Sequence, residues 1–460
     1  MWNPRLSETA RMKYLGIVEA LEADIRSGRV QLGERLPPQR TIADTLEVDL
    51  TTVTRAFNEA RRRGLIAAQA GRGTFISEKI EGHRLPRSDV PSIDLSMNIP
   101  PQPANIDFRK LMSHGISDIL ERPGGLLHLH YQESNGTEVD RAAGAHWLSR
   151  RIADLSVNRI AVTPGAQSAL FAVCALLLKP GDTIMAGATT YPGLKTVAAQ
   201  QKLTIKPLSM DEQGITPDSF ERACQEKSPK AFYVIPTIDN PTTSTMSASR
   251  RREIVALARK YSIPIIEDDP YSPLLPMPVI TFAELARDLT WHIATLSKCA
   301  TPALRIAYLI APSPNCALRL ASVLRATTIM PPPLMSALAA RWIGDGTLES
   351  ITKSIIAENT ARQNIAASIL DGIDYASIPQ APHLWLRLPE GWHARSLTDH
   401  AARIGISIIP SSAFSTGTPQ IEAVRLSLGV APDHDTLAEA LTQLVDLIAT
   451  PPALDTLALV

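Results

Sequence analysis

One lysine with polar neighbours is the first candidate for chemistry in this chain. Lys298 follows the run Thr295-Leu-Ser297, and Arg305 lies seven positions further on. A lysine held out of water becomes a usable amine near neutral pH, because desolvation disfavours its charged form. Such an amine can form a Schiff base with an aldehyde, while Ser297 and Arg305 could donate hydrogen bonds to a phosphate. Pyridoxal 5'-phosphate presents an aldehyde and a phosphate together, although on this stretch alone a surface Ser-Lys pair explains the residues as well.

Composition limits the class of protein and the compartment in which this chemistry would take place. The chain has 460 residues, enough for two or three domains, and its apolar fraction of 45% is typical of a globular protein. Lys and Arg number 46, as do Asp and Glu, so any contact with DNA must come from a local basic patch. The four cysteines have neither paired nor metal-ligand spacing. We therefore expect no metal site and a reducing compartment. Because no signal peptide or bilayer-spanning run is recognisable, we expect that compartment to be the cytoplasm.

Residues 1–77 have the pattern of a small helical module that ends in a hairpin. The sequence predicts helices over 11–26 and 39–46, and a third helix that begins near Thr51 and ends at Arg63. Two short strands, 65–67 and 74–76, flank a glycine-rich tip. Two helices at a tight turn followed by a hairpin describe a winged helix-turn-helix, and a small helical interaction module is the alternative.

Basic and hydroxyl side chains gather where such a module reads DNA. Short hydroxyls at a helix N-terminus can contact phosphates or base edges, and arginine can bind guanine or phosphate through two donors. An arginine at a glycine-flanked tip can enter a minor groove. The residues that we expect to contact DNA are Arg40, Thr51, Thr52, Thr54, Arg55 and Arg72.

Three segments of this module resemble the GntR family of bacterial regulators. They are Gly33-Glu-Arg-Leu-Pro-Pro-Gln-Arg40, Thr51-Thr-Val-Thr-Arg-Ala-Phe57, and Gly64-Leu-Ile with Gly71-Arg-Gly-Thr-Phe75. The resemblance covers nearly all of residues 11–77 and implies binding to double-stranded operator DNA. Leu50 departs from the polar or basic residue that family members often carry at that position.

The composition of residues 78–92 predicts a flexible linker, and the pattern of residues 93–460 predicts an α/β domain. Charge, glycine and proline dominate the linker. Beyond it, an extended lead-in at 94–103 precedes apolar strands that alternate with helices, which indicates a mostly parallel sheet covered on both faces. The strands are expected at 160–163, 183–186, 203–207, 231–235, 263–267, 292–296 and 306–310. A smaller C-terminal α+β part is expected to include strands at 384–388, 406–409 and 424–428.

Polar residues follow several of these strands, at the edge where open α/β sheets hold ligands. Gly165, Ala166 and Gln167 open a helix after a strand, so their backbone N–H groups could bind an anion. Tyr191 could stack on an aromatic ring. Each of these features is common, and alone each is equally well explained as ordinary structure.

The next polar residues suit the ring of the same cofactor. Asn240 could donate to a phenolate oxygen, and Tyr271 could hydrogen-bond to the same side of the ring. Asp268 could pair with a pyridine nitrogen and keep it protonated, which lets the ring withdraw electrons.

This order of residues resembles fold type I pyridoxal-phosphate enzymes, in particular class I aminotransferases, over about residues 93–450. The resemblance implies that Lys298 forms the Schiff base and that Tyr131 reaches the phosphate of the partner subunit. It also implies that Arg425 binds a carboxylate by bidentate pairing, with an ordinary strand arginine as the alternative. Thr243 stands where many relatives carry glycine, which predicts a tighter pocket floor. The cofactor-binding residues implied are Tyr131, Gly165, Ala166, Gln167, Tyr191, Asn240, Asp268, Tyr271, Ser297, Lys298 and Arg305.

A GntR-like module ahead of an aminotransferase-like domain resembles the MocR subfamily of bacterial transcriptional regulators. The resemblance implies a head-to-tail homodimer whose large domain senses a small carboxylate bearing an amino group, by transaldimination at Lys298. The carboxylate of this effector would bind Arg425. The alternative is a working pyridoxal-phosphate-dependent aminotransferase with an appended DNA-binding module, because every residue needed for a half-reaction is present.

Overall fold

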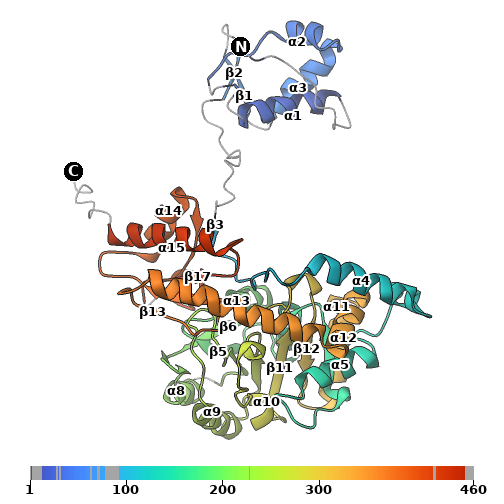
Figure 1. Ribbon diagram of the computed structural model, residues 1–460, viewed down its shortest axis with the longest axis vertical. Coiled ribbons are helices and arrows are strands. Elements are labelled where there is room, and N and C mark those ends of the chain that lie inside the picture. Colours follow the sequence, from blue (N-terminus) through green and yellow to red (C-terminus); the bar gives the residue numbers. More distant parts are fainter. Residues whose placement is uncertain are drawn as a thin grey trace. The chain divides into compact units, whose positions relative to one another are not determined.

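The computed structural model describes residue 2 and residues 13–26, 29–30, 33–62, 65–69, 73–77, 93–226, 228–417 and 421–450. The chain divides into two compact units, Met1–Val90 and Pro91–Val460 (Figure 1). Arg72 and the predicted linker at 78–92 lie outside the described residues. Among the described helices, none is long and apolar enough to cross a membrane.

The described residues of the first unit form three helices and a two-stranded hairpin, as the sequence predicted. Helices α1 (Lys13–Arg26), α2 (Gln39–Thr45) and α3 (Leu50–Arg62) are followed by β1 (Ile66–Gln69) and β2 (Gly73–Ile76), which pair antiparallel. The α3 residues Val53, Ala56, Phe57 and Ala60 recur at helical spacing and are all buried in one core. This arrangement confirms the helix-turn-helix part of the predicted fold.

A seven-stranded sheet forms the centre of the second unit, with strand order β4-β12-β11-β10-β9-β5-β6. All neighbours pair in parallel except β12, which is antiparallel to β11 and to β4. The mostly parallel sheet is therefore confirmed. The strands are β4 (Ile160–Thr163), β5 (Thr183–Gly187), β6 (Thr204–Leu208), β9 (Ala231–Val234), β10 (Ile265–Asp268), β11 (Thr290–Thr295) and β12 (Ala307–Ile310).

Helices cover both faces of this sheet. On β9, Ala231 and Tyr233 join one core, whereas Phe232 and Val234 join another, because successive strand residues point to opposite faces. Helices α6 and α7 contribute to the first core, and α8 and α9 to the second. The helices of this part are α4 (Phe108–Glu121), α5 (Glu138–Leu148), α6 (Ala166–Leu177), α7 (Pro192–Gln201), α8 (Pro217–Glu226), α9 (Ala248–Lys260), α10 (Phe282–Leu285), α11 (Pro314–Thr327) and α12 (Pro333–Gly344).

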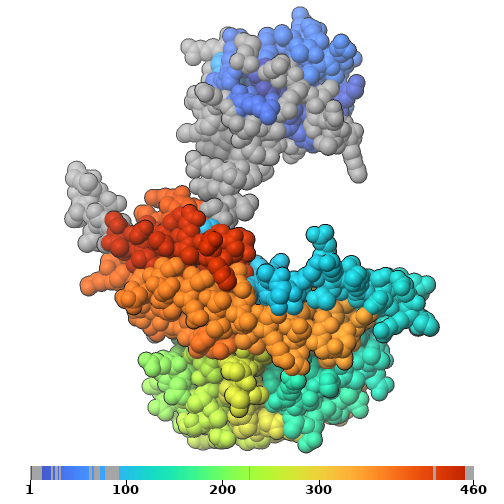
Figure 2. All heavy atoms as spheres, viewed as in Figure 1, coloured from blue at the N-terminus to red at the C-terminus, as the bar shows by residue number. Residues whose placement is uncertain are grey.

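The long helix α13 (Thr347–Ile369) leads into a smaller C-terminal part that includes α14 (Ala394–Arg403) and α15 (His434–Ala449). Figure 2 shows the red surface of α15 lying on the orange surface of α13, and these two helices pack together. The sheet of this part has the order β13-β14-β17-β16, all antiparallel. Its strands are β13 (Tyr375–Ala376), β14 (His383–Arg387), β16 (Ile409–Pro410) and β17 (Ala423–Ser427).

The strand predicted at 406–409 is wrong as a single strand. Residues Ile406–Ser407 form β15, which pairs in parallel with β3 (Ile93–Asp94), whereas Ile409 pairs with Arg425 in the four-stranded sheet. The segment changes sheets at Ile408 because its two halves find partners from distant parts of the chain. The first strand of the second unit, β3, therefore pairs with a strand of its C-terminal part.

Candidate functional site

Lys298 lies just after β11, at the carboxyl edge of the sheet. Its Nζ donates a hydrogen bond to the backbone carbonyl of Asn98. Burial lowers the pKa of Lys298 to about 8, with a further lowering from the Arg425 guanidinium, while Asp268 acts in the opposite direction. The amine therefore loses its proton much more readily than an exposed lysine, as a nucleophilic lysine requires.

Asp268, the last residue of β10, offers one free carboxylate oxygen to a ligand. Its Oδ2 accepts a hydrogen bond of 2.8 Å from the Tyr233 hydroxyl. Its Oδ1 is buried and has no hydrogen-bond partner within the described part of the chain. Burial raises the pKa of Asp268 to about 6, and the bond from Tyr233 counteracts this rise. A buried acceptor without a partner is costly, so the site fits a ring with an N–H group at this position.

The turn before α6 and the turn before β12 meet and make a candidate anion site. Gly165 has a φ of +86°, which favours glycine. A Cβ there would lie 3.0 Å from Nη2 of Arg305, whose guanidinium also donates to the Pro164 carbonyl at 3.2 Å. Ser297 lies near Arg305, because the N–H of the preceding residue, Leu296, donates at 3.2 Å to the carbonyl of Ile306, which follows Arg305. Helix N–H groups beside an arginine suit a phosphate.

Tyr191 and Gln167 are held together beside this anion site. The Gln167 amide nitrogen donates to the Gly193 carbonyl at 3.0 Å, and its Oε1 is buried without a partner among the described residues. A Cβ on Gly193 would collide with both side chains, at 2.1 Å from Tyr191 and 2.4 Å from Gln167. Burial raises the pKa of Tyr191, and the charge of Asp268 raises it further.

Arg425 on β17 reaches the same site from the C-terminal part. Its side chain is buried over the Phe414 ring, 5.1 Å from the ring centre. Nη1 donates to Asn240 Oδ1 at 2.9 Å, Nη2 donates to the Ser96 carbonyl, and Nε has no partner among the described residues. Asn240 turns its amide oxygen toward Arg425, and its amide nitrogen is the group that can donate to a phenolate.

The structure adds two residues that sequence reasoning missed, Asn98 and His383. The Asn98 amide nitrogen lies 2.9 Å from the Tyr271 hydroxyl and 3.3 Å from His383 Nδ1. His383 Nε2 lies 3.2 Å from the Asp239 carbonyl, which can only accept, so Nε2 carries the proton and Nδ1 accepts from Asn98. Burial, followed by the charge of Arg425, lowers the pKa of His383 to about 3, so the ring stays neutral. Neither residue lies in a recognisable motif.

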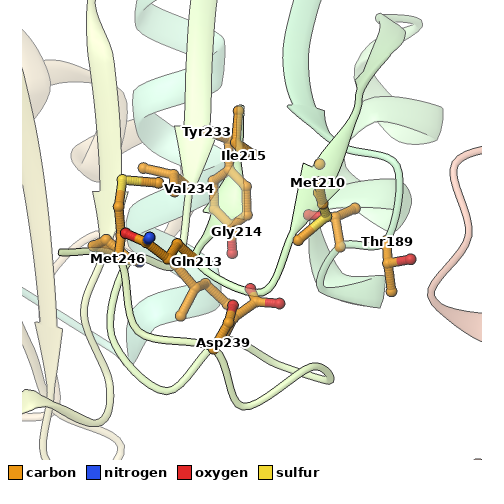
Figure 3. Close-up of a pocket in the computed structure, with 14 residues that line it drawn as sticks. Thr189, Met210, Gln213, Gly214, Ile215, Tyr233, Val234, Asp239 and Met246 are labelled. Atoms are coloured by element: carbon orange, nitrogen blue, oxygen red, sulfur yellow. The ribbon is translucent and has the colours of Figure 1, made fainter. Parts of the chain in front are cut away.

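A small pocket beside the site is too small to hold an effector. It lies between the β7–β8 hairpin (Met210–Asp211 and Gly214–Ile215) and the loop that carries Asp239, with Tyr233 as one wall (Figure 3). Its cavity volume of about 20 Å³ leaves room for about one water molecule. The loop also contains Thr243, which is buried with a φ of +62°, a conformation that favours glycine.

Tyr131 lies outside this cluster. Its side chain is 82% exposed and lines a surface hollow with Gln132, Arg325 and Ile329. The predicted contact with a partner subunit's phosphate stays a prediction.

The predicted DNA-contacting residues of α3 lie on one surface. Leu50, Thr51, Thr52, Thr54 and Arg55 line the same hollow at the start of the helix. The Thr54 hydroxyl donates to Gln39 Oε1 at 3.0 Å or to the Leu50 carbonyl at 2.9 Å, and Arg55 lies 5.9 Å from the centre of the Tyr14 ring. These two side chains therefore also brace α3 against α2 and α1. Arg40 is exposed on α2.

Comparisons with known proteins agree with both units. Residues 91–444 match the family described as aminotransferase class I and II, and residues 13–76 match the bacterial regulatory proteins of the gntR family. An HTH-type transcriptional regulator of Bacillus subtilis, YdeF, is 30% identical over 93% of this chain and 92% of its own length. An aromatic-amino-acid aminotransferase of Thermococcus litoralis is 26% identical over 70% of this chain and 80% of its own length.

Solved structures of aminotransferases share the fold of the second unit. A kynurenine aminotransferase of Pyrococcus horikoshii superposes with a TM-score of 0.72 and 23% identity, over 78% of this chain and 90% of that one. The α-aminoadipate aminotransferase LysN of Thermus thermophilus superposes with a TM-score of 0.70 and 21% identity, over 78% and 92% of the two chains.

Proposed function

Because the chain belongs to the MocR subfamily of GntR-type regulators, in which a helix-turn-helix unit precedes an aminotransferase class I and II domain, we propose that it is a DNA-binding regulator that senses a small amino acid. The observation that carries this proposal is that Lys298 and Arg425 both bind one short segment of backbone, at Asn98 and Ser96. A ligand with an amine and a carboxylate meets both groups. The regulator would act in the cytoplasm, on double-stranded operator DNA.

The residues present fit pyridoxal phosphate. Asp268 Oδ1 would accept from the ring nitrogen, Tyr191 would lie against the ring, and the Gly165 turn with Arg305 would hold the phosphate. Tyr271 and the amide of Asn240 would donate to the phenolate side. When bound, the cofactor supplies an aldehyde carbon at which one amine can replace another, the exchange known as transaldimination.

Arg425 would select the acidic end of the effector. A carboxylate accepts two charge-assisted hydrogen bonds from a guanidinium, and the unpartnered Nε is available for one of them. The effector amine would take the place of Lys298 on the cofactor, and Nζ of Lys298 would take up a proton. The difference between these two states is what can shift affinity for DNA.

A head-to-tail homodimer would complete the site. The exposed Tyr131 follows a 3-10 turn, Gly125–Leu129, in which Leu126, Leu127 and Leu129 are each more than 60% exposed. Exposed apolar side chains clustered on one segment favour a protein contact. In the dimer, Tyr131 would reach the phosphate of the partner subunit.

A working aminotransferase is the second candidate. It is favoured by the presence of Lys298, Asp268 and Arg425 in one site and by the aminotransferases among the relatives. One experiment separates the two: the cofactor-loaded protein is mixed with DNA from upstream of its own gene, with and without a mixture of amino acids. If the protein is a regulator, it forms a salt-sensitive complex with the DNA, and this complex changes when the amino acids are added. Less than one molecule of 2-oxo acid then forms per active site. Sustained 2-oxo acid formation without specific DNA binding would favour the enzyme.

A further inference from the structure

We propose that Leu50 reads the methyl group of a thymine in the major groove, so that each half of the operator carries a thymine opposite the start of α3. This inference deepens the proposed function and rests on it. In a helix-turn-helix, the second helix lies in the major groove with its N-terminal residues on the base edges. That helix is α3 in this chain, and Leu50 is its first residue.

Leu50 is not part of the core of the first unit. That core takes Val53, Ala56, Phe57 and Ala60 from the same helix. Among the described residues of the unit, Leu50 is the large apolar side chain that is exposed, at 39%. A single exposed leucine is common on protein surfaces, so the surroundings of this one decide what it can do.

Two hydroxyl groups in the hollow beside Leu50 already have acceptors within the unit. The Thr54 hydroxyl donates to Gln39 Oε1 or to the Leu50 carbonyl, and the Thr51 hydroxyl donates to Asp49 Oδ1 at 3.4 Å. Neither hydroxyl hydrogen needs an acceptor on a base. Leu50 has no polar group in its side chain and gains only from an apolar contact.

The thymine methyl group is the apolar contact that the major groove offers. Guanine, adenine and cytosine present hydrogen-bond donors and acceptors there, whereas thymine presents one acceptor and its methyl group. A leucine placed against a polar edge takes water away from donors or acceptors without replacing their bonds, which is costly. Against a thymine, the leucine and the methyl group remove apolar surface from water together. Leu50 can therefore favour thymine without making a hydrogen bond.

Charged side chains near Leu50 can supply the affinity that does not depend on sequence. Arg40 on α2 and Arg55 on α3 are both exposed. Arginines on phosphates position a protein on DNA, whereas contacts to base edges specify the sequence. Leu50 carries no charge, so we expect it to change which sequence is bound and to leave the affinity for unrelated DNA unchanged.

The first arm of the test finds the preferred sequence. The cofactor-loaded full chain selects sites from a pool of random duplex DNA as wild type, Leu50→Ala and the matched control Ile404→Ala, whose side chain in the second unit is 44% exposed. Wild type and control should enrich one sequence with a thymine at a fixed position of each half-site. Leu50→Ala should enrich the same sequence with that position unspecified. Identical preferences in Leu50→Ala overturn the proposal, and no enriched sequence with wild type contradicts the proposed function as well.

The second arm removes the methyl group from the DNA. Uracil, which pairs as thymine does but lacks the methyl group, replaces that thymine in a duplex of the selected sequence. Wild type should bind the uracil duplex roughly fourfold more weakly per half-site, the value of one buried methyl group, and Leu50→Ala should bind both duplexes alike. Leu50→Met, which keeps an apolar side chain of similar size, should retain the wild-type difference.

Two results of the second arm would overturn the inference and leave the proposed function standing. An equal loss on the uracil duplex in wild type and Leu50→Ala would assign the methyl group to another side chain. Weaker binding of Leu50→Ala to selected and unrelated DNA alike, with the uracil effect retained, would mean that Leu50 supports the fold of the unit.

Discussion

The Tyr233 hydroxyl on β9 donates a hydrogen bond of 2.8 Å to Oδ2 of Asp268 on the neighbouring strand β10. This bond uses one carboxylate oxygen and leaves Oδ1 buried and without a partner among the described residues. A phenol donor favours the ionised carboxylate where water is excluded. The pair therefore presents a single charged acceptor, which suits a protonated ring nitrogen.

Tyr233→Phe should weaken cofactor binding by roughly tenfold, because a hydrogen bond to a charged group is lost. The pKa of Asp268 should also rise further, since the Tyr233 bond opposes the effect of burial. Cofactor affinity, measured by absorbance titration at several pH values, checks both effects. Tyr308→Phe is the matched control, because the buried Tyr308 hydroxyl has no partner among the described residues. Equal affinity in both variants would show that the Tyr233 bond has no such role.

Lys298→Ala should keep DNA binding and lose the effector response. The variant retains Asp268 and the phosphate turn, so the cofactor should bind, more weakly and without the visible absorbance that its bond to Lys298 gives. DNA footprints with and without the amino-acid mixture provide the measurement. An unaltered effector response in Lys298→Ala would falsify exchange at this lysine as the switch.

Attachment of the cofactor should accelerate as the pH rises through about 8, the pKa to which burial lowers Lys298. Only the neutral amine attacks an aldehyde, and its fraction increases until the pH exceeds this pKa. The rate of absorbance change after mixing cofactor-free protein with pyridoxal phosphate, between pH 6 and 9.5, is the readout. A rate that keeps rising tenfold per pH unit up to pH 9.5 would mean that the lysine titrates normally.

Asp239→Asn should stabilise the cofactor-free protein at pH 8 more than at pH 5. Burial raises the pKa of Asp239 to about 7, so the folded state binds more protons than the unfolded state between about pH 4 and 7. Stability therefore falls as the pH rises through this interval, by roughly 4 kcal/mol at most. Asparagine can still accept the 2.7 Å bond from the Thr242 hydroxyl. Urea unfolding at both pH values, with the exposed Asp399→Asn as control, tests this expectation.

Arg40→Ala should weaken DNA binding on every sequence alike and reduce the salt dependence by about one phosphate contact. Arg40 is exposed on α2, beside the residue that meets Thr54 of α3. Binding titrations at several salt concentrations, on operator and unrelated DNA, give the slope. Arg252→Ala, an exposed arginine of α9, should change nothing. Loss of affinity for one sequence alone would assign Arg40 to base recognition.

Local sequence determined the helices and strands and most of the site residues at the carboxyl edge of the sheet. The strand predicted at 160–163 has those bounds in the structure, because its apolar run is buried and ends at a glycine turn. Lys298 and Asn240 come after strands and Asp268 ends one, and the carboxyl ends of parallel strands meet at one edge. Their grouping was therefore predictable from order along the chain.

Tertiary structure alone decided what holds these groups in place. Asn98 and Lys298 are 200 residues apart, Asn98 and His383 are 285 apart, and Ser96 and Arg425 are 329 apart. The strand at 406–409 was divided for the same reason, since its halves pair with Ile93 and with Arg425. Periodicity and turn chemistry act over a few residues, whereas these contacts exist only after the second unit has folded back on its own beginning.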